Sequence, residues 1–181
     1  DEGVCYLSLV TDAYSHKIVG WSLGPTLETR YPLEALRMAL ATVPYGQTHA
    51  LIHHSDRGCQ YCSYEYVNEL RKHDVGISMT QSGDPLENAV AERANGILKT
   101  EWLYKMKFPT REKCRSELER IIQFYNSQRP HMSIGMQTPD EVHGQEGPQK
   151  RCWKTYRERR EANKKISLEE GGPVGGDNPV G

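Results

Sequence analysis

The chain has 181 residues, of which 36% are hydrophobic, and a formal net charge of −1 at pH 7. This length suits one domain of ordinary size with a buried core. The sequence contains no run of about 18 apolar residues and no signal-peptide pattern, which argues against a membrane or exported protein. We therefore expect a cytoplasmic protein.

The near-neutral average hides a charge gradient. Residues 1–100 carry a net charge of −4, whereas residues 101–181 carry +3. Within 149–165, eight basic residues face two glutamates, with Trp153 and Tyr156 interleaved. Such a block could bind along a nucleic-acid phosphate backbone. A solvated basic helix explains it equally well.

The first 80 residues predict alternating strands and helices. The apolar runs VCYLSLV (4–10) and KIVGWSL (17–23) flank the turn residues TDAYSH, which predicts an antiparallel hairpin. A helix opened by Pro32, a short strand at 50–53, a helix at 63–73 capped by Ser63 and a strand at 75–79 follow. This order predicts one mixed sheet whose later strands run parallel through helical crossovers.

The second half predicts mainly helices. Asp84, Pro85 and Glu87 form the start of a helix over DPLENAVAERANGILKTEW, in the pattern of a capping box. The next helix runs from Thr110 to about Ser127, and Pro130 follows it. Its apolar face is formed by Cys114, Leu118, Ile121, Ile122 and Tyr125. Thr138-Pro139 begins a short last turn. We expect a basic, helical segment at 144–166 and a disordered Gly/Pro-rich tail at 167–181.

Asp56 lies in the loop that begins just after the short strand at 50–53. Ligands collect at the carboxyl ends of parallel strands, because the loops there diverge and leave a crevice. Taken alone, a loop aspartate more simply caps or turns the chain.

The helix begun at Asp84 carries a polar stripe. At 100° per residue, Asn88, Asn95 and Lys99 all fall within about 60° of Glu92. Two carboxylates from different elements, Asp56 and Glu92, can share a divalent cation. Oxygen ligands favour Mg²⁺ or Mn²⁺ over zinc.

A zinc site is the weaker interpretation. Cys59 and Cys62 are the only close cysteine pair, and the adjacent His53 and His54 point to opposite faces of a strand. Two ordinary thiols explain this pair more simply.

Five ordered motifs now carry a family resemblance. Asp56 and Glu92 are separated by 35 residues, and Lys99 lies seven positions after Glu92. Together with VTDAYSHKIVGW, HSDRG, NAVAE, YNSQRPH and TPDEVH, residues 3–143 resemble the integrase-type catalytic core of bacterial insertion-sequence transposases, which is related to retroviral integrases. The resemblance implies a ribonuclease-H-like α/β core over 1–143, in which acidic residues hold two Mg²⁺ (or Mn²⁺) ions.

The resemblance also implies a function and residue roles. The family nicks DNA at transposon ends and transfers the strand to target DNA, so we expect DNA as partner, a homo-oligomer in a synaptic complex, and association with the bacterial nucleoid. Asp56 and Glu92 would be catalytic metal ligands, and Lys99 would contact a phosphate. Asn95 would orient DNA or Glu92. Alternatively, it is an ordinary polar residue on the helix surface. Arg129 and His131 are scaffold residues or DNA contacts.

One feature departs from the family pattern. The family's first catalytic aspartate lies on a strand before the hairpin, and this sequence begins after that point. We therefore expect a core without its first strand and without one metal ligand, weak metal binding, and no transposition by the isolated chain. Asp12 matches a separate hairpin-turn aspartate of the family.

Two other functions stay open at this point. One is a catalytically dead DNA-binding or assembly module, and the other is a ribonuclease-H-like nuclease without strand transfer.

Overall fold

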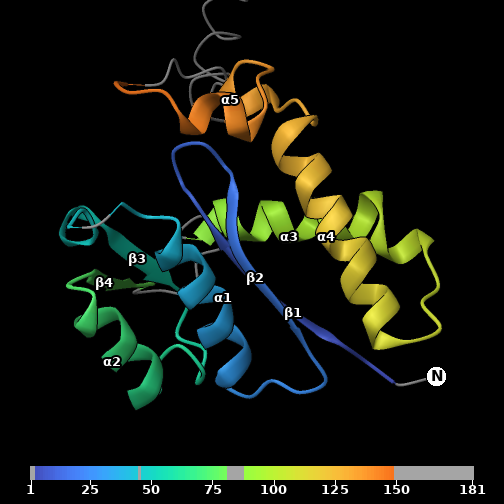
Figure 1. Cartoon of the computed structure of the whole chain (residues 1–181), viewed down its shortest axis with the longest axis horizontal. Coiled ribbons are helices and arrows are strands. Elements are labelled where there is room, and N and C mark those ends of the chain that lie inside the picture. The colour runs from blue at the N-terminus through green and yellow to red at the C-terminus, as the bar shows by residue number, and fades with distance from the viewer. Residues whose placement is uncertain (1–2, 45, 81–87, 149–181) are drawn as a thin grey trace, which may run out of the picture.

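The computed structural model describes residues 3–44, 46–80 and 88–148. The described strands are β1 (Tyr6–Thr11), β2 (Ile18–Gly24), β3 (Ile52–Ser55) and β4 (Gly76–Met79). The helices are α1 (Arg30–Ala41), α2 (Tyr64–Lys72), α3 (Ala89–Glu101), α4 (Arg111–Ser127) and α5 (Pro139–His143), with short 3-10 turns η1 (Thr48–Ala50), η3 (Leu103–Lys105) and η4 (Met132–Ile134). Figure 1 shows their arrangement. No described helix is long and apolar enough to cross a membrane.

The predicted hairpin is confirmed. β1 and β2 pair antiparallel, with a register irregularity between Val10 and Thr11. Alternate residues of β2 face opposite sides. The Ser22 hydroxyl donates to Glu34 of α1 at 2.7 Å, whereas the ring of Trp21 lies under the guanidinium of Arg115 of α4.

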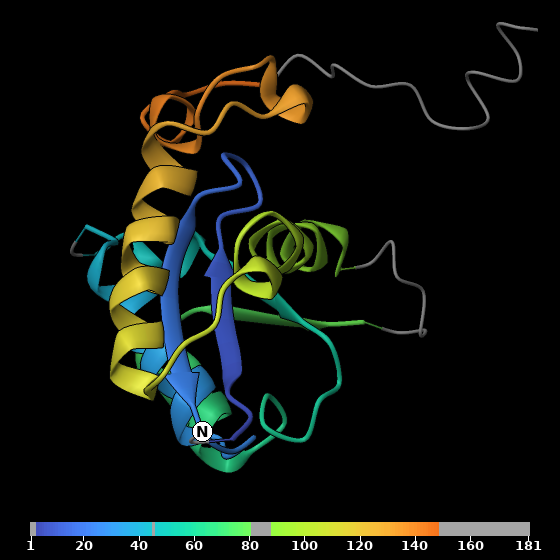
Figure 2. The same cartoon turned by 90° about the vertical axis from the view of Figure 1, so that its right-hand side faces the viewer.

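The main core lies between the hairpin and the helices α3 and α4. Its buried members are Ile18, Leu23, Ala94, Ile97, Leu98, Leu118, Ile121, Ile122 and Tyr125. The predicted apolar face of α4 therefore packs as expected, and α4 begins after a Thr110 cap whose hydroxyl accepts from the Lys113 N–H. Figure 2 shows α4 running along the hairpin.

A second core joins α1 to the β3–β4 unit. It contains Leu33, Leu36, Leu40, Tyr66, Leu70 and Val75. The predicted parallel strands are confirmed, since β3 pairs parallel with β4 through α2. Ser63 caps α2 as predicted. β3 begins at Ile52, two residues later than the sequence predicted, because η1 takes up residues 48–50.

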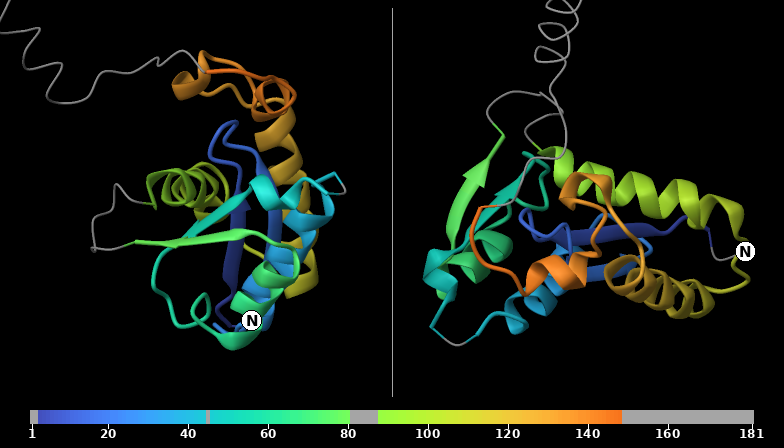
Figure 3. Two further views of the ribbon diagram at one scale, coloured as in Figure 1. Left: turned by 90° about the vertical axis from the view of Figure 1, so that its left-hand side faces the viewer. Right: turned by 90° about the horizontal axis from the view of Figure 1, so that it is seen from above.

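The predicted single sheet is divided in the described part of the chain. The β1–β2 pair and the β3–β4 pair are separate two-stranded sheets, which lie side by side in Figures 1 and 3. A cavity lined by both β1 and β3 separates the two pairs, so their backbones do not join into one ladder.

The remaining predictions have mixed outcomes. α3 is confirmed from Ala89 onward, whereas the proposed cap at Asp84 to Glu87 lies outside the described residues. The basic segment from 149 and the Gly/Pro-rich tail also lie outside them. α5 begins with a capping box between Thr138 and Glu141, as Thr138-Pro139 predicted.

Candidate functional site

Asp56 lies where the sequence placed it, directly after β3 and therefore at the carboxyl end of a parallel pair. Its side chain is exposed, and Oδ1 accepts the Gly58 N–H at 2.8 Å. Arg57 fixes the same loop to the end of β4, because its Nε donates to the Thr80 carbonyl at 2.7 Å. The carboxylate is thus held at the rim of the strand pair and open to solvent.

The polar stripe of α3 forms the second half of the site. Glu92 lies in the first turn of α3 and is exposed, as is Lys99 two turns further on. Between them, the Oδ1 atom of Asn95 is buried and accepts no hydrogen bond from the described residues. The stripe therefore presents a carboxylate, an unsatisfied amide oxygen and an ammonium along one helix.

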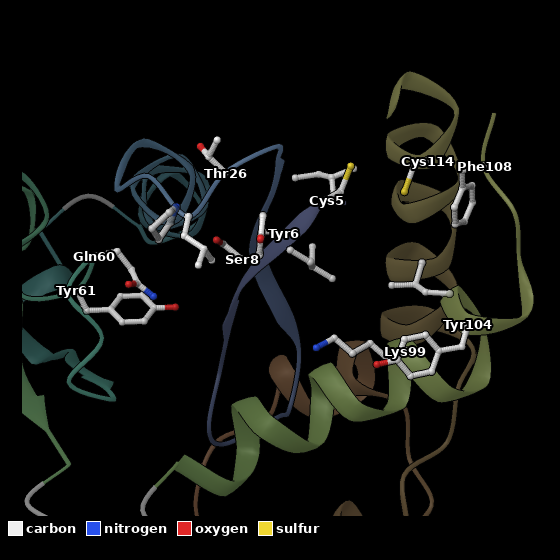
Figure 4. Close-up of a pocket in the computed structure, with 15 residues that line it drawn as sticks. Cys5, Tyr6, Ser8, Thr26, Gln60, Tyr61, Lys99, Tyr104, Phe108 and Cys114 are labelled. Atoms are coloured by element: carbon white, nitrogen blue, oxygen red, sulfur yellow. The ribbon is translucent and has the colours of Figure 1, made fainter. Parts of the chain in front are cut away.

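A cavity of about 330 Å³ is lined by residues of both elements, although neither Asp56 nor Glu92 is among its lining residues. Lys99 and Tyr104 line it from the α3 side, and Gln60 and Tyr61 line it from the loop that follows Asp56 (Figure 4). Burial, and then the negative charge of Asp56, raises the pKa of the Tyr61 hydroxyl. The loop after Asp56 and the Lys99 end of the stripe thus open onto one space.

The chemical type of the side-chain donors is suited to a hard divalent cation. Asp56 and Glu92 supply exposed carboxylate oxygens, which Mg²⁺ and Mn²⁺ prefer. The Oγ of Ser55, next to Asp56, is another buried polar atom without a hydrogen-bond partner in the described chain. Residues 3–44, 46–80 and 88–148 contain no cluster of three or more His, Cys, Asp or Glu side chains that could hold a metal ion.

Asp12 has the hairpin-turn role that the sequence predicted. Its Oδ2 accepts from the Ser15 hydroxyl at 2.5 Å and the Ser15 N–H at 3.0 Å, and lies 3.2 Å from Nδ1 of His143. Burial raises the pKa of Asp12, but the hydrogen bonds from Ser15 and His143 outweigh it and lower the pKa. This carboxylate holds the hairpin tip against α5.

Arg129 and His131 lie in the scaffold. The Arg129 side chain is 20% exposed and pairs with Glu101 at the end of α3. His131 is 5% exposed, and its ring centroid lies 4.7 Å from that of Tyr125. Burial, and then the charge of Arg129, lowers the pKa of His131 to about 4. These contacts support the scaffold interpretation, whereas a contact with DNA stays a prediction.

The histidines before Asp56 point to different partners, as predicted. His53 Nε2 lies 3.2 Å from the Tyr66 hydroxyl of α2, whereas His54 Nδ1 lies 2.9 Å from the Ser78 hydroxyl of β4. Cys59 and Cys62 are exposed free thiols.

Three cavity residues were missed from the sequence. Gln60, Tyr61 and Tyr104 share the cavity with Lys99. The adjacency of Gln60-Tyr61 to Asp56-Arg57-Gly58 is the signal that could have found two of them. Tyr104 carries no such signal, because no local pattern predicts that η3 borders this cavity.

Models of known families match most of the chain. One model described as an integrase core domain matches residues 1–85, and a second with the same description matches residues 73–139.

Curated relatives agree with these matches. The chain is 34% identical over 148 residues to the transposase InsF for insertion sequence IS3fB of Escherichia coli (strain K12), which is 80% of this chain and 50% of that protein. It is 31% identical over 142 residues to the transposase for insertion sequence element IS629 of Shigella sonnei, which is 78% of this chain and 47% of that protein. The chain thus spans about half the length of the curated relatives it matches.

Solved structures share the fold. The catalytic core domain of BIV integrase superposes with a TM-score of 0.57 at 15% identity, over 88% of this chain and 89% of that one. The HTLV-2 integrase catalytic core domain in complex with magnesium (trimeric form) superposes with a TM-score of 0.55 at 17% identity. The match covers 74% of this chain and 80% of that one. Retroviral integrase cores of this kind are ribonuclease-H-like, which confirms the predicted fold class. The chain belongs to the integrase core domain family, in the branch of the insertion-sequence transposases.

Proposed function

We propose that this chain is the catalytic core of a DNA transposase, which nicks DNA at transposon ends and transfers the strand to target DNA. One observation carries the proposal: Gln60 and Tyr61 of the loop after Asp56 line the same cavity as Lys99, which lies two turns after Glu92 on α3. Carboxylates beside a cation are suited to phosphoryl transfer, which depends on positioning and charge stabilisation.

Asp56 and Glu92 are the proposed catalytic residues and metal ligands. A bound Mg²⁺ or Mn²⁺ would supply an activated water or 3′-hydroxyl and stabilise the departing oxygen. The chain itself contributes the placement of the two carboxylates, one on a loop held by Arg57 and one on a rigid helix. Asn95 has an unsatisfied oxygen one turn from Glu92, and we assign it to orienting Glu92 or the DNA.

Lys99 is the proposed phosphate contact. Its ammonium is exposed and reaches into the cavity (Figure 4), so it can meet a phosphate as a point charge. Arg129 is paired with Glu101 at the end of α3, whereas the ring of His131 packs against Tyr125 of α4. Any contact of these two residues with DNA would need their ion pair and ring packing to open.

The proposed partners are transposon ends, target DNA and further copies of the protein. Solved relatives of this fold include an HTLV-2 integrase core in dimeric and trimeric forms and a simian T-cell lymphotropic virus intasome. We infer a homo-oligomer in a synaptic complex, acting on DNA in the bacterial cytoplasm at the nucleoid.

We further propose that residues 1–181 alone bind the metal weakly and do not join DNA. Asp56 and Glu92 are the two proposed ligands, and tight octahedral binding of Mg²⁺ needs more oxygen donors.

The decisive experiment compares variants of a transposase that carries this core. Glu92→Gln keeps the shape of the side chain but removes its charge, so nicking and joining should fall below detection while binding to transposon ends persists. Glu119 is an exposed residue of α4, and the control Glu119→Gln should leave nicking, joining and end binding unchanged. Nicking that survives Glu92→Gln would refute the assignment.

The same assay separates the two other candidate functions. The absence of a three-acid cluster in the described chain favours a binding module as the second candidate. End binding without any nicking by the unmodified protein would establish that module. Nicked product without joined product would establish a nuclease.

A further inference from the structure

Three sulfur atoms lie beside the loop that follows Asp56. Cys59 and Cys62 are exposed free thiols of this loop, and Met79 is the last residue of β4. The Sγ atom of Cys62 lies 3.9 Å from the Sδ atom of Met79. The cysteine pair is visible in the sequence, whereas the thioether comes to it only through the fold. The structure thus adds a third soft donor to the pair.

A tight backbone turn brings the two cysteines onto one side of the loop. The N–H groups of Tyr61 and Cys62 both donate to the Gly58 carbonyl, at 3.0 and 3.2 Å, so this part of the loop forms one helix-like turn. Side chains three positions apart in such a turn are neighbours, with Cβ atoms about 5–6 Å apart. The Cys59 thiol is exposed and donates to the side chain of the next residue at 3.4 Å. Rotation about its Cα–Cβ bond can therefore direct it toward Cys62.

The cysteine turn is held against the end of β4, where the thioether lies. β3 and β4 are parallel, and Ser55 at the end of β3 is paired with Met79. Arg57, in the loop between β3 and the turn, donates to the carbonyl of Thr80 at 2.7 Å. These backbone contacts place Met79 beside the turn without any help from a metal ion.

The sulfur separation matches that of two donors on one metal ion. Metal–thiolate bonds are about 2.3 Å long, so two sulfurs on one trigonal or tetrahedral ion lie about 3.8–4.0 Å apart. Cys62 and Met79 already meet this condition at 3.9 Å. Thiolate and thioether sulfurs are soft ligands, and such ligands select Cu(I).

We propose that Cys59, Cys62 and Met79 form a trigonal site for one Cu(I) ion. Both cysteines bind as thiolates, so two Cu–S bonds replace two S–H bonds and two protons pass to the solvent. The thioether donates a lone pair without losing a proton. Copper stays in the +1 state throughout, so the step needs no oxidant or reductant. Carboxylate oxygens select hard cations instead, so this inference does not depend on whether the chain cuts DNA.

A second cysteine pair of the described chain provides an internal comparison. Cys5 and Cys114 both line the cavity of about 330 Å³, across it from Tyr61 (Figure 4). Burial, and then the neighbouring Cys5, raises the pKa of the Cys114 thiol. The thiolate rather than the thiol binds metal. This pair should therefore bind Cu(I) more weakly than the exposed pair, Cys59 and Cys62.

The test is an anaerobic titration of the full 181-residue chain with Cu(I), in competition with the coloured chelator bicinchoninate. One Cu(I) ion per chain should resist the chelator, and X-ray absorption of the loaded protein should show three sulfurs at about 2.3 Å. Cys59→Ser and Cys62→Ser should each lose this ion. Met79→Leu keeps a side chain of similar volume but has no sulfur, so it should fold normally and bind Cu(I) about tenfold more weakly.

Matched control variants remove sulfur from other parts of the chain. Met132→Leu, at a side chain that is 76% exposed, should bind Cu(I) like the unmodified chain. The same holds for the combined change Cys5→Ser and Cys114→Ser, and for Cys152→Ser outside the described residues. The proposal is overturned by the absence of a chelator-resistant ion, by loss of that ion in any control, by a coordination of only two sulfurs, or by equal affinities of Met79→Leu and the unmodified chain.

Discussion

Arg129 and Glu101 form a two-point ion pair that ties the last residue of α3 to the segment after α4. Arg129 Nε donates to Oε2 at 2.8 Å, and Nη2 donates to Oε1 at 2.5 Å. The hydrogen bonds from Arg129 lower the pKa of Glu101, and the same bonds raise the pKa of Arg129. The candidate metal ligand Glu92 and the phosphate contact Lys99 are on the helix that this pair anchors.

Replacing Arg129 by Met should destabilise the protein. The change leaves the Glu101 carboxylate, whose side chain is 39% exposed, without its donors, and solvent screening reduces the contribution of such a pair to about 1 kcal/mol. We expect the free energy of unfolding to fall by about 1 kcal/mol in urea titrations. Arg120→Met, at an exposed surface pair with Glu117, should change it by less than about 0.5 kcal/mol. Equal effects of the two changes would refute the anchoring role.

Asn126 should be a second anchor of the hairpin. Its side chain is buried, accepts the Ile18 N–H at 2.9 Å and donates to the Ile18 carbonyl at 2.9 Å. Asn126→Ala leaves both backbone groups buried and unpaired, which costs about 1–3 kcal/mol. Urea unfolding should show this loss. The neighbouring Ser127→Ala, on the exposed face of α4, serves as the control and should be close to neutral.

The anchors show what the sequence could and could not predict. Local signals located the ends of elements correctly, as at Ser63, Thr110 and Thr138, because a cap depends on residues three positions apart. Asp56 and the α3 stripe followed from strand and helix periodicity in the same way.

Long-range contacts were beyond local patterns. The partners of Arg129 and Asn126 are 28 and 108 residues away in the chain, so no periodicity reveals them. The division of the sheet was likewise missed. It depends on whether two strand edges come within hydrogen-bonding distance, which is decided by packing around β1 and β3.

His131 should make stability depend on pH. Its pKa is about 4 in the folded protein, against an ordinary value of 6.5, because burial and Arg129 disfavour the charged ring. The unfolded chain therefore binds more protons between these values, so stability is complete above pH 6.5 and falls as the pH drops toward 4. The loss from this residue should approach about 3 kcal/mol.

Unfolding titrations across this pH range test the effect. His131→Phe keeps a ring against Tyr125 but cannot titrate, so its stability should depend less steeply on pH than that of the unmodified protein. His49→Ala, at an exposed position, should keep the original slope. A His131→Phe profile parallel to that of the unmodified protein would show that the ring does not control this transition.

Lys99 should contribute to DNA affinity without base preference. Removing a phosphate contact weakens DNA binding by a similar factor for every DNA sequence. It also lowers the slope of log affinity against log salt concentration by about one. Lys99→Met in a transposase carrying this core should show both effects in fluorescence anisotropy. Lys113→Met removes an exposed lysine that pairs with Glu117 at 3.1 Å, and it should leave the slope unchanged. A sequence-dependent loss at Lys99 would instead indicate a base contact.

Gly20 and Gly96 should respond in opposite ways to alanine. A Cβ at Gly20 would overlap the carbonyl oxygen of Ala35 and lie 2.9 Å from the Ala39 nitrogen, so α1 would have to move away from β2. Gly20→Ala should therefore cost about 3 kcal/mol. At Gly96, inside α3, a Cβ meets no described atom within 4 Å, and alanine should stabilise the helix by up to about 1 kcal/mol. Thermal and urea unfolding of the two variants will measure the change in the free energy of unfolding, which should be a loss for Gly20→Ala and a gain for Gly96→Ala. A tolerated Gly20→Ala would mean that α1 does not lie this close to β2.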